Sequence, residues 1–503
     1  MALAQPRSLW LESASPPSYP TLPGYAQADV AVVGGGIVGL TTALLLKEAG
    51  LSVVLIDSGR IGAQVSGHTT AKITSQHGLR YEYLIQHFGE QAARTYAESN
   101  ETAIAHMGAI IERLGIDCDF ERLPSYLYTR DSGREDELKR EAEAAERLGL
   151  PAGYVNEVPL PFQAVGAVRF TEQAQFQPYR YLTALADAVD GGNGAVFEQT
   201  RALSVRGERP RRVITDRGTV TARDVVIATN LPFLDRGGFF TKAYPRRHLV
   251  IAAKLDPTQL PAGTFLSVDQ PSRSLRGYRR GEDGWLIAVG DGFKPGHADT
   301  LNKYHALERF VHEHFPAAEL SHWWGNQDYD SMDRVPYIGH LTPGSKHLYT
   351  ACGFNAWGMT LGTVAAEIIS DRIRGVDNPW ADLYRATRLK PRTSGGTFLQ
   401  TNMHVAGKWI MDRVRSRTER SVYELAPGEG GLAKKGNETV AAYRDKDGTL
   451  HMLSPDCSHL RCGLLWNRAE RSWDCPCHGS RFDIHGRVLH GPAVDDLENK
   501  SEP

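Results

Sequence analysis

Two short boxes near the C-terminus constrain the fold of this chain more than any other feature. Residues 457–462 read Cys-Ser-His-Leu-Arg-Cys, and residues 475–480 read Cys-Pro-Cys-His-Gly-Ser. Read together, they give Cys-x-His, fifteen intervening residues, and then Cys-x-x-His. A [2Fe–2S] cluster with two cysteines on one iron and two histidines on the other requires this donor set. The pattern therefore predicts two loops that close over a one-electron metal centre.

Zinc is the competing interpretation, because two cysteines and two histidines are also a zinc donor set. Zinc fingers usually place both cysteines in one half and both histidines in the other, whereas each box here holds one of each. Unrelated buried cysteines are a third interpretation. Four of the six cysteines fall within twenty-one residues, which argues against it. The iron–sulfur interpretation is favoured, and its neutral imidazoles raise the reduction potential above that of an all-cysteine cluster.

The boxes, followed by Gly-Pro-Ala at residues 491–493 as a candidate loop over the cluster, closely resemble the Rieske domain family. The resemblance implies that the ligands are Cys457, His459, Cys475 and His478. It also matches Cys462 and Cys477 to the disulfide of Rieske proteins of the respiratory cytochrome bc type. Two reduced, packed thiols remain the alternative, because cytosolic redox conditions disfavour a bridge.

A second cofactor motif lies near the N-terminus. Residues 29–33 form a short apolar run typical of a buried parallel strand. Gly-Gly-Gly-Ile-Val-Gly follows at 34–39, then helical spacing over 40–49 with a glycine stop. The next predicted strand, 51–56, ends at Asp57. This strand–turn–helix–strand–acid context is far more specific than the glycines alone and indicates a dinucleotide site.

Each residue of this motif has a physical task. Gly34 permits the tight turn, Gly36 lets the backbone approach a pyrophosphate, and Gly39 brings the helix close to the strand. The helix N-terminus attracts the phosphates, and Asp57 accepts hydrogen bonds from ribose hydroxyls. A glycine-rich turn without a ligand is the disfavoured alternative.

Later segments distinguish FAD from NAD. Residues 220–229 read as a hairpin followed by a buried strand, and 348–353 as another buried strand. The second strand leads into a glycine-rich turn at 358–362 and a helix over 363–373, which suits part of a flavin cofactor. In this order, the segments resemble the FAD-dependent amine and amino-acid oxidoreductases of the D-amino-acid oxidase type. The resemblance covers about residues 27–388, with further matches at 175–188 and 333–339.

The resemblance implies an FAD held by Gly34, Gly36, Gly39, Asp57, Thr69, Thr70, Gly353, Gly358, Met359 and Thr360. His68 is a further cofactor-site candidate, since several amine-oxidising relatives bond a histidine near this position covalently to the flavin. A histidine that hydrogen-bonds near the pyrophosphate or lines the site is the favoured alternative.

Candidate substrate contacts are less well specified. Arg276 and Tyr278 precede the predicted strand that begins at Gly284, where relatives often project substrate contacts. An arginine there could clamp a carboxylate with two hydrogen bonds. Surface ion pairing in an arginine-rich turn is the alternative. Trp357 and Tyr329 are candidates to flank the flavin, although large aromatic residues more often belong to the core.

The remaining patterns predict the domain organisation. The expected fold class is an α/β Rossmann-like FAD-binding domain with an interleaved α+β substrate domain, plus a small all-β Rieske domain. Helices are predicted over 81–115 and 134–148, and strands within 195–222, 246–253 and 284–289. The predicted bounds are 1–26 for an N-terminal extension, 27–390 for the oxidoreductase, 391–420 for a connector helix and 421–503 for the Rieske domain. FAD-binding segments are expected at about 27–80, 195–232 and 330–390.

Bulk composition excludes several functions. The chain has 503 residues, enough for about three domains. Its net charge of −2 gives no reason to expect a nucleic-acid partner, and nothing in the sequence sets an oligomeric state. No apolar run approaches the ~20 residues of a membrane span, and the N-terminus lacks an apolar signal core. We therefore expect a cytoplasmic enzyme.

Flavin accepts a hydride, which carries two electrons, and a [2Fe–2S] cluster accepts one electron. This chain is therefore expected to convert two-electron transfer into one-electron transfer. The first hypothesis is an amine or amino-acid dehydrogenase that reduces FAD and passes electrons singly to the cluster and on to an external one-electron carrier. In the second, the cluster feeds electrons to the flavin of a reductase or monooxygenase, although a second dinucleotide motif is absent from the sequence. The third is a non-catalytic redox sensor or electron-transfer subunit, which the intact FAD glycines disfavour.

Overall fold

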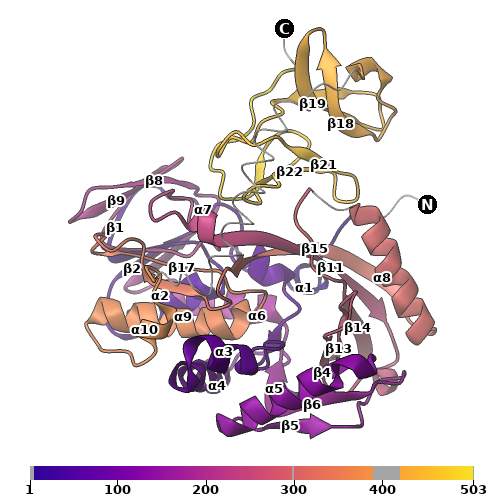
Figure 1. The fold of residues 1–503 in the computed structure, drawn as a ribbon. Helices are drawn as coiled ribbons and strands as arrows, with labels where there is room; N and C mark the ends of the chain where they lie inside the picture. The colour runs from indigo at the N-terminus through magenta and orange to yellow at the C-terminus, as the bar shows by residue number, and fades with distance from the viewer. Residues whose placement is uncertain (1–4, 297–298, 389–419, 502–503) are drawn as a thin grey trace.

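The computed structural model describes residues 5–296, 299–388 and 420–501. Two large sheets with their helices form the main body, and a small all-β module at the C-terminus lies against it (Figure 1). This confirms the predicted fold class. The predicted connector helix, 391–420, falls almost entirely outside the described residues.

A largely parallel eight-stranded sheet contains the dinucleotide motif. Its strands are Gly24–Val33 (β1), Val53–Ile56 (β2), Gly194–Phe197 (β7), Ala202–Arg206 (β8), Arg211–Thr215 (β9), Gly218–Ile227 (β10), Tyr337–His340 (β16) and Leu348–Cys352 (β17). The order is β16-β17-β10-β1-β2-β7, with β8 and β9 extending from β10. Val30 and Val32 pack into one core cluster and Ala31 and Val33 into another, so β1 is buried on both faces. This explains its uninterrupted apolar run.

A nine-stranded mixed sheet forms the second layer. Its strands are Lys72–Ile73 (β3), Glu121–Thr129 (β4), Ala152–Val155 (β5), Gly166–Gln175 (β6), Ala243–Lys254 (β11), Thr264–Ser267 (β12), Ser274–Arg280 (β13), Asp283–Val289 (β14) and Glu319–Ser331 (β15). The order is β15-β11-β14-β13-β12-β4-β6-β3, with β5 paired to β6. The strands of this sheet alternate along the chain with those of the first, as the interleaved organisation predicts.

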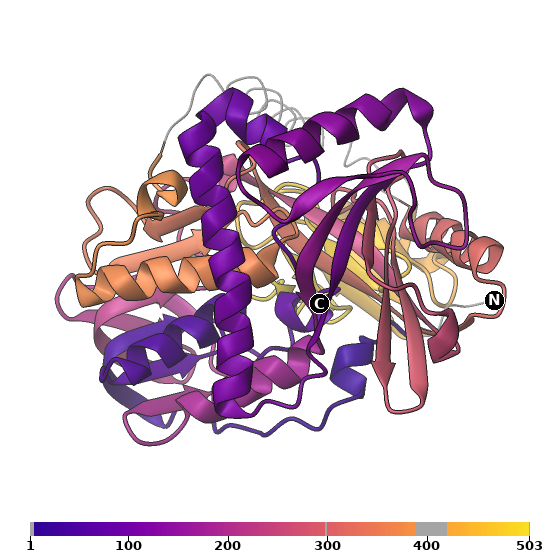
Figure 2. The same cartoon turned by 90° about the horizontal axis from the view of Figure 1, so that it is seen from below.

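The helices are Leu9–Glu12 (α1), Ile37–Glu48 (α2), Tyr81–Phe88 (α3), Glu90–Leu114 (α4), Glu135–Arg147 (α5), Pro178–Val189 (α6), Phe239–Lys242 (α7), Thr300–His314 (α8), Gly358–Arg374 (α9) and Ala381–Tyr384 (α10). In Figure 2, α4 is the long purple helix that lies between the two sheets. The single helix predicted over 81–115 is divided at Gly89, whose φ of +85° lies outside the helical region.

The N-terminal segment is part of the folded body. Trp10 of α1 is 0% exposed, and its indole Nε1 donates a hydrogen bond to the carbonyl of Thr69 at 2.7 Å. Its ring packs edge-on against Tyr278 of β13, with the ring centroids 4.9 Å apart. The segment predicted as an extension therefore covers one face of the mixed sheet.

The C-terminal module contains two small antiparallel sheets. Their strands are Gly430–Lys435 (β18), Glu438–Arg444 (β19) and Leu450–Leu453 (β20), then Leu465–Asn467 (β21), Ser472–Asp474 (β22), Arg481–Phe482 (β23) and Val488–His490 (β24). The two cysteine–histidine boxes occupy the loops before β21 and between β22 and β23. Figure 1 shows this yellow module above the long strands β11 and β15.

Within the described ranges, no helix combines the length and apolar character needed to cross a lipid bilayer.

Candidate active site and metal centre

The turn between β1 and α2 has the close approaches that a dinucleotide requires. A Cβ atom at Gly39 would lie 1.8 Å from the Gly34 carbonyl oxygen, so only glycine lets the helix approach the strand. Gly34 has a φ of +109°, in the region that favours glycine. The N-cap of α2 is Gly36, which provides no side-chain cap. The Ile37 N–H donates to Ser66 Oγ at 3.1 Å, and the backbone N–H groups that follow in α2 suit a pyrophosphate.

Asp57 ends β2 as predicted, and its buried carboxylate braces the turn. It accepts hydrogen bonds from the backbone N–H groups of Gly35 at 2.7 Å and Gly59 at 2.8 Å. Burial raises the pKa of Asp57 despite these bonds. A contact with ribose stays a prediction.

A narrow cleft runs from the N-terminus of α2 to the N-terminus of α9. Its lining includes Gly36 and Ser66 on one side and Gly358 and Met359 on the other. The cleft adjoins a larger cavity of about 630 Å³, and Thr69 and Met359 line both. Such a continuous hollow between two helix N-termini suits an extended flavin dinucleotide. The predicted FAD residues that line at least one of the two hollows are Gly36, Thr69, Thr70, Gly358 and Met359.

The remaining predicted FAD residues lie behind this lining. Gly353 has a φ of +77°, and Thr360 donates a hydrogen bond from its hydroxyl to the Thr74 carbonyl at 3.1 Å. His68 lines neither hollow, and its Nδ1 lies 2.8 Å from the Gln64 carbonyl oxygen. Burial lowers the pKa of His68. A histidine near the pyrophosphate stays the favoured prediction for His68, ahead of a covalent link to the flavin.

The larger cavity lies between the two sheets and is rich in cations. Lys72 lines it, and burial lowers the pKa of this lysine to about 7. Trp357 stacks on His77 in the cavity wall, with ring centroids 4.8 Å apart. The wall also includes Arg246 and Asp330, joined by an ion pair of 2.7 Å.

Neither Arg276 nor Tyr278, the predicted substrate contacts, lines the cavity. Arg276 is 0% exposed, donates to the Ala71 carbonyl at 2.9 Å and lies 5.0 Å from the ring of Trp10. The Tyr278 hydroxyl donates to Asp119 at 2.8 Å. Trp10 covers both side chains, and no local pattern in β13 signals this distant contact.

Sequence reasoning missed the polar side chains of β15. Asn326, Asp328 and Asp330 alternate along the strand and line the two hollows. Asp328 accepts a hydrogen bond from the backbone N–H of Ala356 at 2.7 Å. Polar residues at every second position are a recognisable strand signal, but only the fold shows that this face of β15 borders a cavity.

The two boxes bring their predicted ligands together. Cys457 and Cys475 are buried, and their thiols hydrogen-bond to each other. The rings of His459 and His478 lie 5.2 Å apart between centroids. Each ring leaves a buried Nδ1 atom without a hydrogen-bond partner in the described part of the chain. Two thiols beside two unpartnered imidazole nitrogens fit a mixed-ligand [2Fe–2S] cluster.

Cys462 and Cys477 form a disulfide that joins the two boxes. Their sulfur atoms and Cys475 Sγ all lie within 4.8 Å of one another. Since two of these three sulfurs are bonded to each other, the group is no separate metal site, and the disulfide borders the predicted cluster.

The family model for the FAD dependent oxidoreductases (DAO) matches residues 29–372, and the Rieske [2Fe-2S] domain model matches residues 419–500. The chain belongs to the FAD dependent oxidoreductase family and carries a Rieske domain. It is an oxidoreductase of this family, with FAD and a [2Fe–2S] cluster as cofactors.

Among its relatives is the putative Rieske 2Fe-2S iron-sulfur protein YhfW of Bacillus subtilis (strain 168), 33% identical over 98% of this chain and 97% of that protein. Gamma-glutamylputrescine oxidoreductase of Escherichia coli (strain K12) is 24% identical over 71% of this chain and 86% of its own. Glycine oxidase from Geobacillus kaustophilus has a similar fold, with a TM-score of 0.61 at 19% identity over 72% of this chain and 99% of its own.

A single strand separates the cavity of the FAD oxidoreductase from the Rieske cluster loops. Asp328 and Asp330 of β15 face the hollows, while the intervening Tyr329 points to the opposite side. The Tyr329 hydroxyl donates a hydrogen bond to the carbonyl of His478 at 2.9 Å. Tyr329 therefore lies between the hollows and the Rieske domain.

The histidine side of the Rieske domain faces the FAD domain. His459 Nε2 lies 2.8 Å from Asp235 Oδ1, and the ring of Phe240 lies edge-on to His478 at 5.4 Å between centroids. Both Asp235 and Phe240 belong to the FAD oxidoreductase. The predicted imidazole ligands thus lie at the domain boundary.

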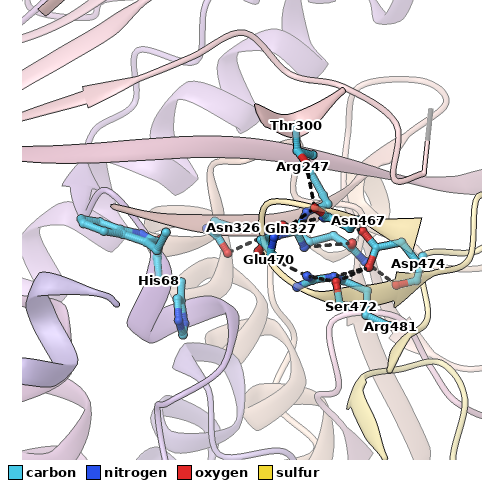
Figure 3. Close-up of polar contacts among 12 residues, drawn as sticks. His68, Arg247, Thr300, Asn326, Gln327, Asn467, Glu470, Ser472, Asp474 and Arg481 are labelled. Carbon is cyan, nitrogen blue, oxygen red and sulfur yellow. Dashed lines mark hydrogen bonds and ion pairs between the residues drawn. The ribbon is translucent and has the colours of Figure 1, made fainter. Parts of the chain in front are cut away.

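A buried ion pair joins the FAD oxidoreductase to the Rieske domain (Figure 3). Arg247 Nη2 of β11 lies 2.5 and 2.6 Å from the two carboxylate oxygens of Glu470. The two side chains are 1% and 5% exposed. Arg481 also contacts Glu470 at 3.2 Å, and Thr300 donates across the boundary to Asn467 at 2.7 Å. Figure 3 shows these groups in one cluster, with His68 beside it.

Replacing Asp328 with asparagine is expected to change how stability depends on pH. Burial raises the pKa of Asp328 from 3.8 to about 7, so the folded state binds this proton more tightly than the unfolded state. Its contribution to the free energy of unfolding is therefore present below pH 3.8 and is lost as the pH rises to about 7. Asp328→Asn removes this loss, worth about 4 kcal/mol at neutral pH. Urea unfolding of both proteins at pH 5 and pH 8 checks this, and parallel pH slopes would contradict it.

Proposed function

We propose that the enzyme oxidises an amine or amino acid by hydride transfer to FAD and passes the electrons singly through the Rieske cluster to an external one-electron carrier. The observation that carries this proposal is the position of β15, one face of which borders the hollows while Tyr329 on the other contacts the cluster loop. A single strand between the two sites favours direct electron exchange within the chain.

The substrate chemistry follows from the family and from the cavity. The relatives named above include an oxidoreductase of gamma-glutamylputrescine and an oxidase of glycine. In the proposed reaction, carbon loses a hydride and nitrogen loses a proton, so that a C=N bond forms. FAD supplies the acceptor for the hydride, and the cluster supplies one-electron transfer.

The chain's own groups can orient the substrate and hold its proton. Asp328 lies at the cleft, where its pKa of about 7 lets it exchange a proton near neutral pH. Lys72 lines the adjoining cavity, and burial also brings its pKa to about 7. Trp357 and His77 form a stacked aromatic part of the same cavity wall.

The proposal includes the cofactor ligands. We assign the FAD to residues Gly34, Gly36, Gly39, Asp57, His68, Thr69, Thr70, Gly353, Gly358, Met359 and Thr360. We assign the cluster to residues Cys457, His459, Cys475 and His478. The glycine geometry of the turn and the unpartnered imidazole nitrogens support these assignments.

Anaerobic titration with candidate amines and amino acids tests the proposal. Bleaching of the flavin absorbance should be followed by the EPR signal of a reduced Rieske cluster. Each substrate molecule supplies two electrons, so it should support two successive one-electron reductions of the cluster when an external acceptor reoxidises the cluster between them. A flavin that bleaches while the cluster stays oxidised would overturn it. If no amine bleaches the flavin but a pre-reduced cluster reduces it, the result would favour electron flow from the cluster to the flavin, as in a reductase or monooxygenase.

A further inference from the structure

Three arginines and one carboxylate lie in the wall of the larger cavity. Arg246 Nε lies 2.7 Å from Asp330 Oδ2. Arg80 and Arg334 also act electrostatically on Asp330, although neither forms an ion pair anywhere in the described ranges. All four side chains line the cavity. If Asp330 is ionised, this cluster carries two positive charges in excess.

Two neighbouring carboxylates lie outside the cavity wall. Asp333 is held by Arg388 through two bonds of 2.8 and 2.7 Å. Glu141 accepts from the backbone N–H groups of Arg80 at 2.8 Å and Tyr81 at 2.7 Å, and it also acts electrostatically on Arg80. Neither carboxylate lines the cavity.

Arg80 provides a second and independent observation. It is only 6% exposed, and its buried Nε has no hydrogen-bond partner in the described part of the chain. Its Nη1 contacts the carbonyl of Arg334. Arg334 itself is exposed at the cavity wall, lies over the ring of Tyr83 at 4.3 Å and has a φ of +61°. A buried guanidinium that lines a cavity without a carboxylate partner is costly unless an anion in the cavity pairs with it.

We propose that Arg80, Arg246 and Arg334 bind the carboxylate groups of the substrate, which is a dicarboxylic amino acid. Guanidinium groups match carboxylates with paired hydrogen bonds. Two carboxylates on a substrate whose reacting amine is uncharged would balance the two excess positive charges. This assignment of substrate class rests on the proposed amine oxidation, whereas the anion site itself does not.

The experiment compares glutamate with glutamine, in L, D and N-methyl forms, by anaerobic flavin bleaching of the holoenzyme. A glutamate form should be favoured over its matched glutamine form by at least about tenfold in kcat/KM. Arg334→Gln should raise KM for that form by about tenfold and leave kcat within about twofold. Arg134→Gln is the matched control, because Arg134 lines the same cavity but already pairs with Glu137 at 2.6 Å.

Calorimetric titration with glutarate separates the anion site from the reaction. Wild-type and Arg134→Gln holoenzymes should bind glutarate alike, and Arg334→Gln should bind it about tenfold more weakly. Glutarate binding without bleaching by any amine would leave the anion site standing and count against the proposed oxidation. Three results would overturn the substrate class. They are equal kcat/KM for glutamate and glutamine, a preference for phosphate-bearing amines, and a glutarate affinity that is unchanged in Arg334→Gln.

Discussion

Glu470→Ala is expected to loosen the Rieske domain from the FAD domain and to slow electron transfer between their cofactors by at least about tenfold. The variant leaves Arg247, which is 1% exposed, as a buried charge without its carboxylate partner. Removing one partner of a buried pair typically costs about 3–5 kcal/mol. Because Arg247 and Glu470 belong to different domains, most of this cost should fall on docking rather than on the fold of either domain.

Flash photoreduction of the flavin measures this effect without a substrate. The cluster should become reduced quickly in the wild type and slowly in Glu470→Ala, while the flavin absorbance and the Rieske EPR signal stay unchanged. Asp283→Asn is the matched control, since Asp283 pairs with Lys254 of the same strand β11 at 3.7 Å on the surface. Exposed pairs of this kind contribute about 0–1 kcal/mol, so wild-type transfer is expected.

A double variant tests whether the unpaired charge of Arg247 causes the loss of docking. Replacing both members, as in Arg247→Met with Glu470→Met, removes the unpaired charge and keeps side chains of similar volume. Such replacements of buried pairs are often neutral or stabilising, so docking and electron transfer should largely recover. Undiminished transfer in Glu470→Ala alone would contradict the role of this pair.

Cys475→Ser is expected to abolish the Rieske cluster and leave the FAD in place. Cys475 is 1% exposed and lies beside the Cys457 thiol, and its loss removes one of the two predicted sulfur ligands of one iron. Substrate should still bleach the flavin, but reduction of a one-electron acceptor through the cluster should fall to background. Iron analysis and EPR measure the loss of the cluster. Flavin absorbance measures the retention and bleaching of the FAD, and the reduction rate of the one-electron acceptor measures electron flow through the cluster.

The matched control for this variant is Cys118→Ser. Cys118 is equally buried, at 1% exposure, but lies in the FAD oxidoreductase away from the boxes. It should keep the full complement of iron and the EPR signal. Retention of a normal Rieske signal by Cys475→Ser would show that the ligand assignment is wrong.

Local patterns predicted the parts of the molecule that depend on neighbours in sequence. Three kinds of short motif were predicted: the glycines of the β1–α2 turn, the buried strands and the two cysteine–histidine boxes. The residues within each motif lie close together in the sequence. The contacts within such a unit depend on residues close together in the sequence. Gly39 is an example, because a Cβ atom there would lie 1.8 Å from the carbonyl oxygen of Gly34. The fold class and both cofactors followed from these units.

Predictions that needed distant contacts were weaker. Arg276 looked like a substrate contact because of its position before a strand, yet Trp10, far away in sequence, covers it. Tyr329 was a candidate to flank the flavin, yet its hydroxyl contacts the Rieske loop at His478. In both cases the side-chain direction depends on which segment packs against the strand.

Short contiguous motifs specify which cofactors this protein carries, because they encode the cofactor ligands and the tight turns. The packing of the sheets and domains places β15 between the two sites, brings Arg247 to Glu470, and puts three arginines and Asp330 in one cavity wall. These contacts join residues separated by long stretches of chain. They arise from how the sheets and the C-terminal module pack, and no spacing within a single segment encodes such packing.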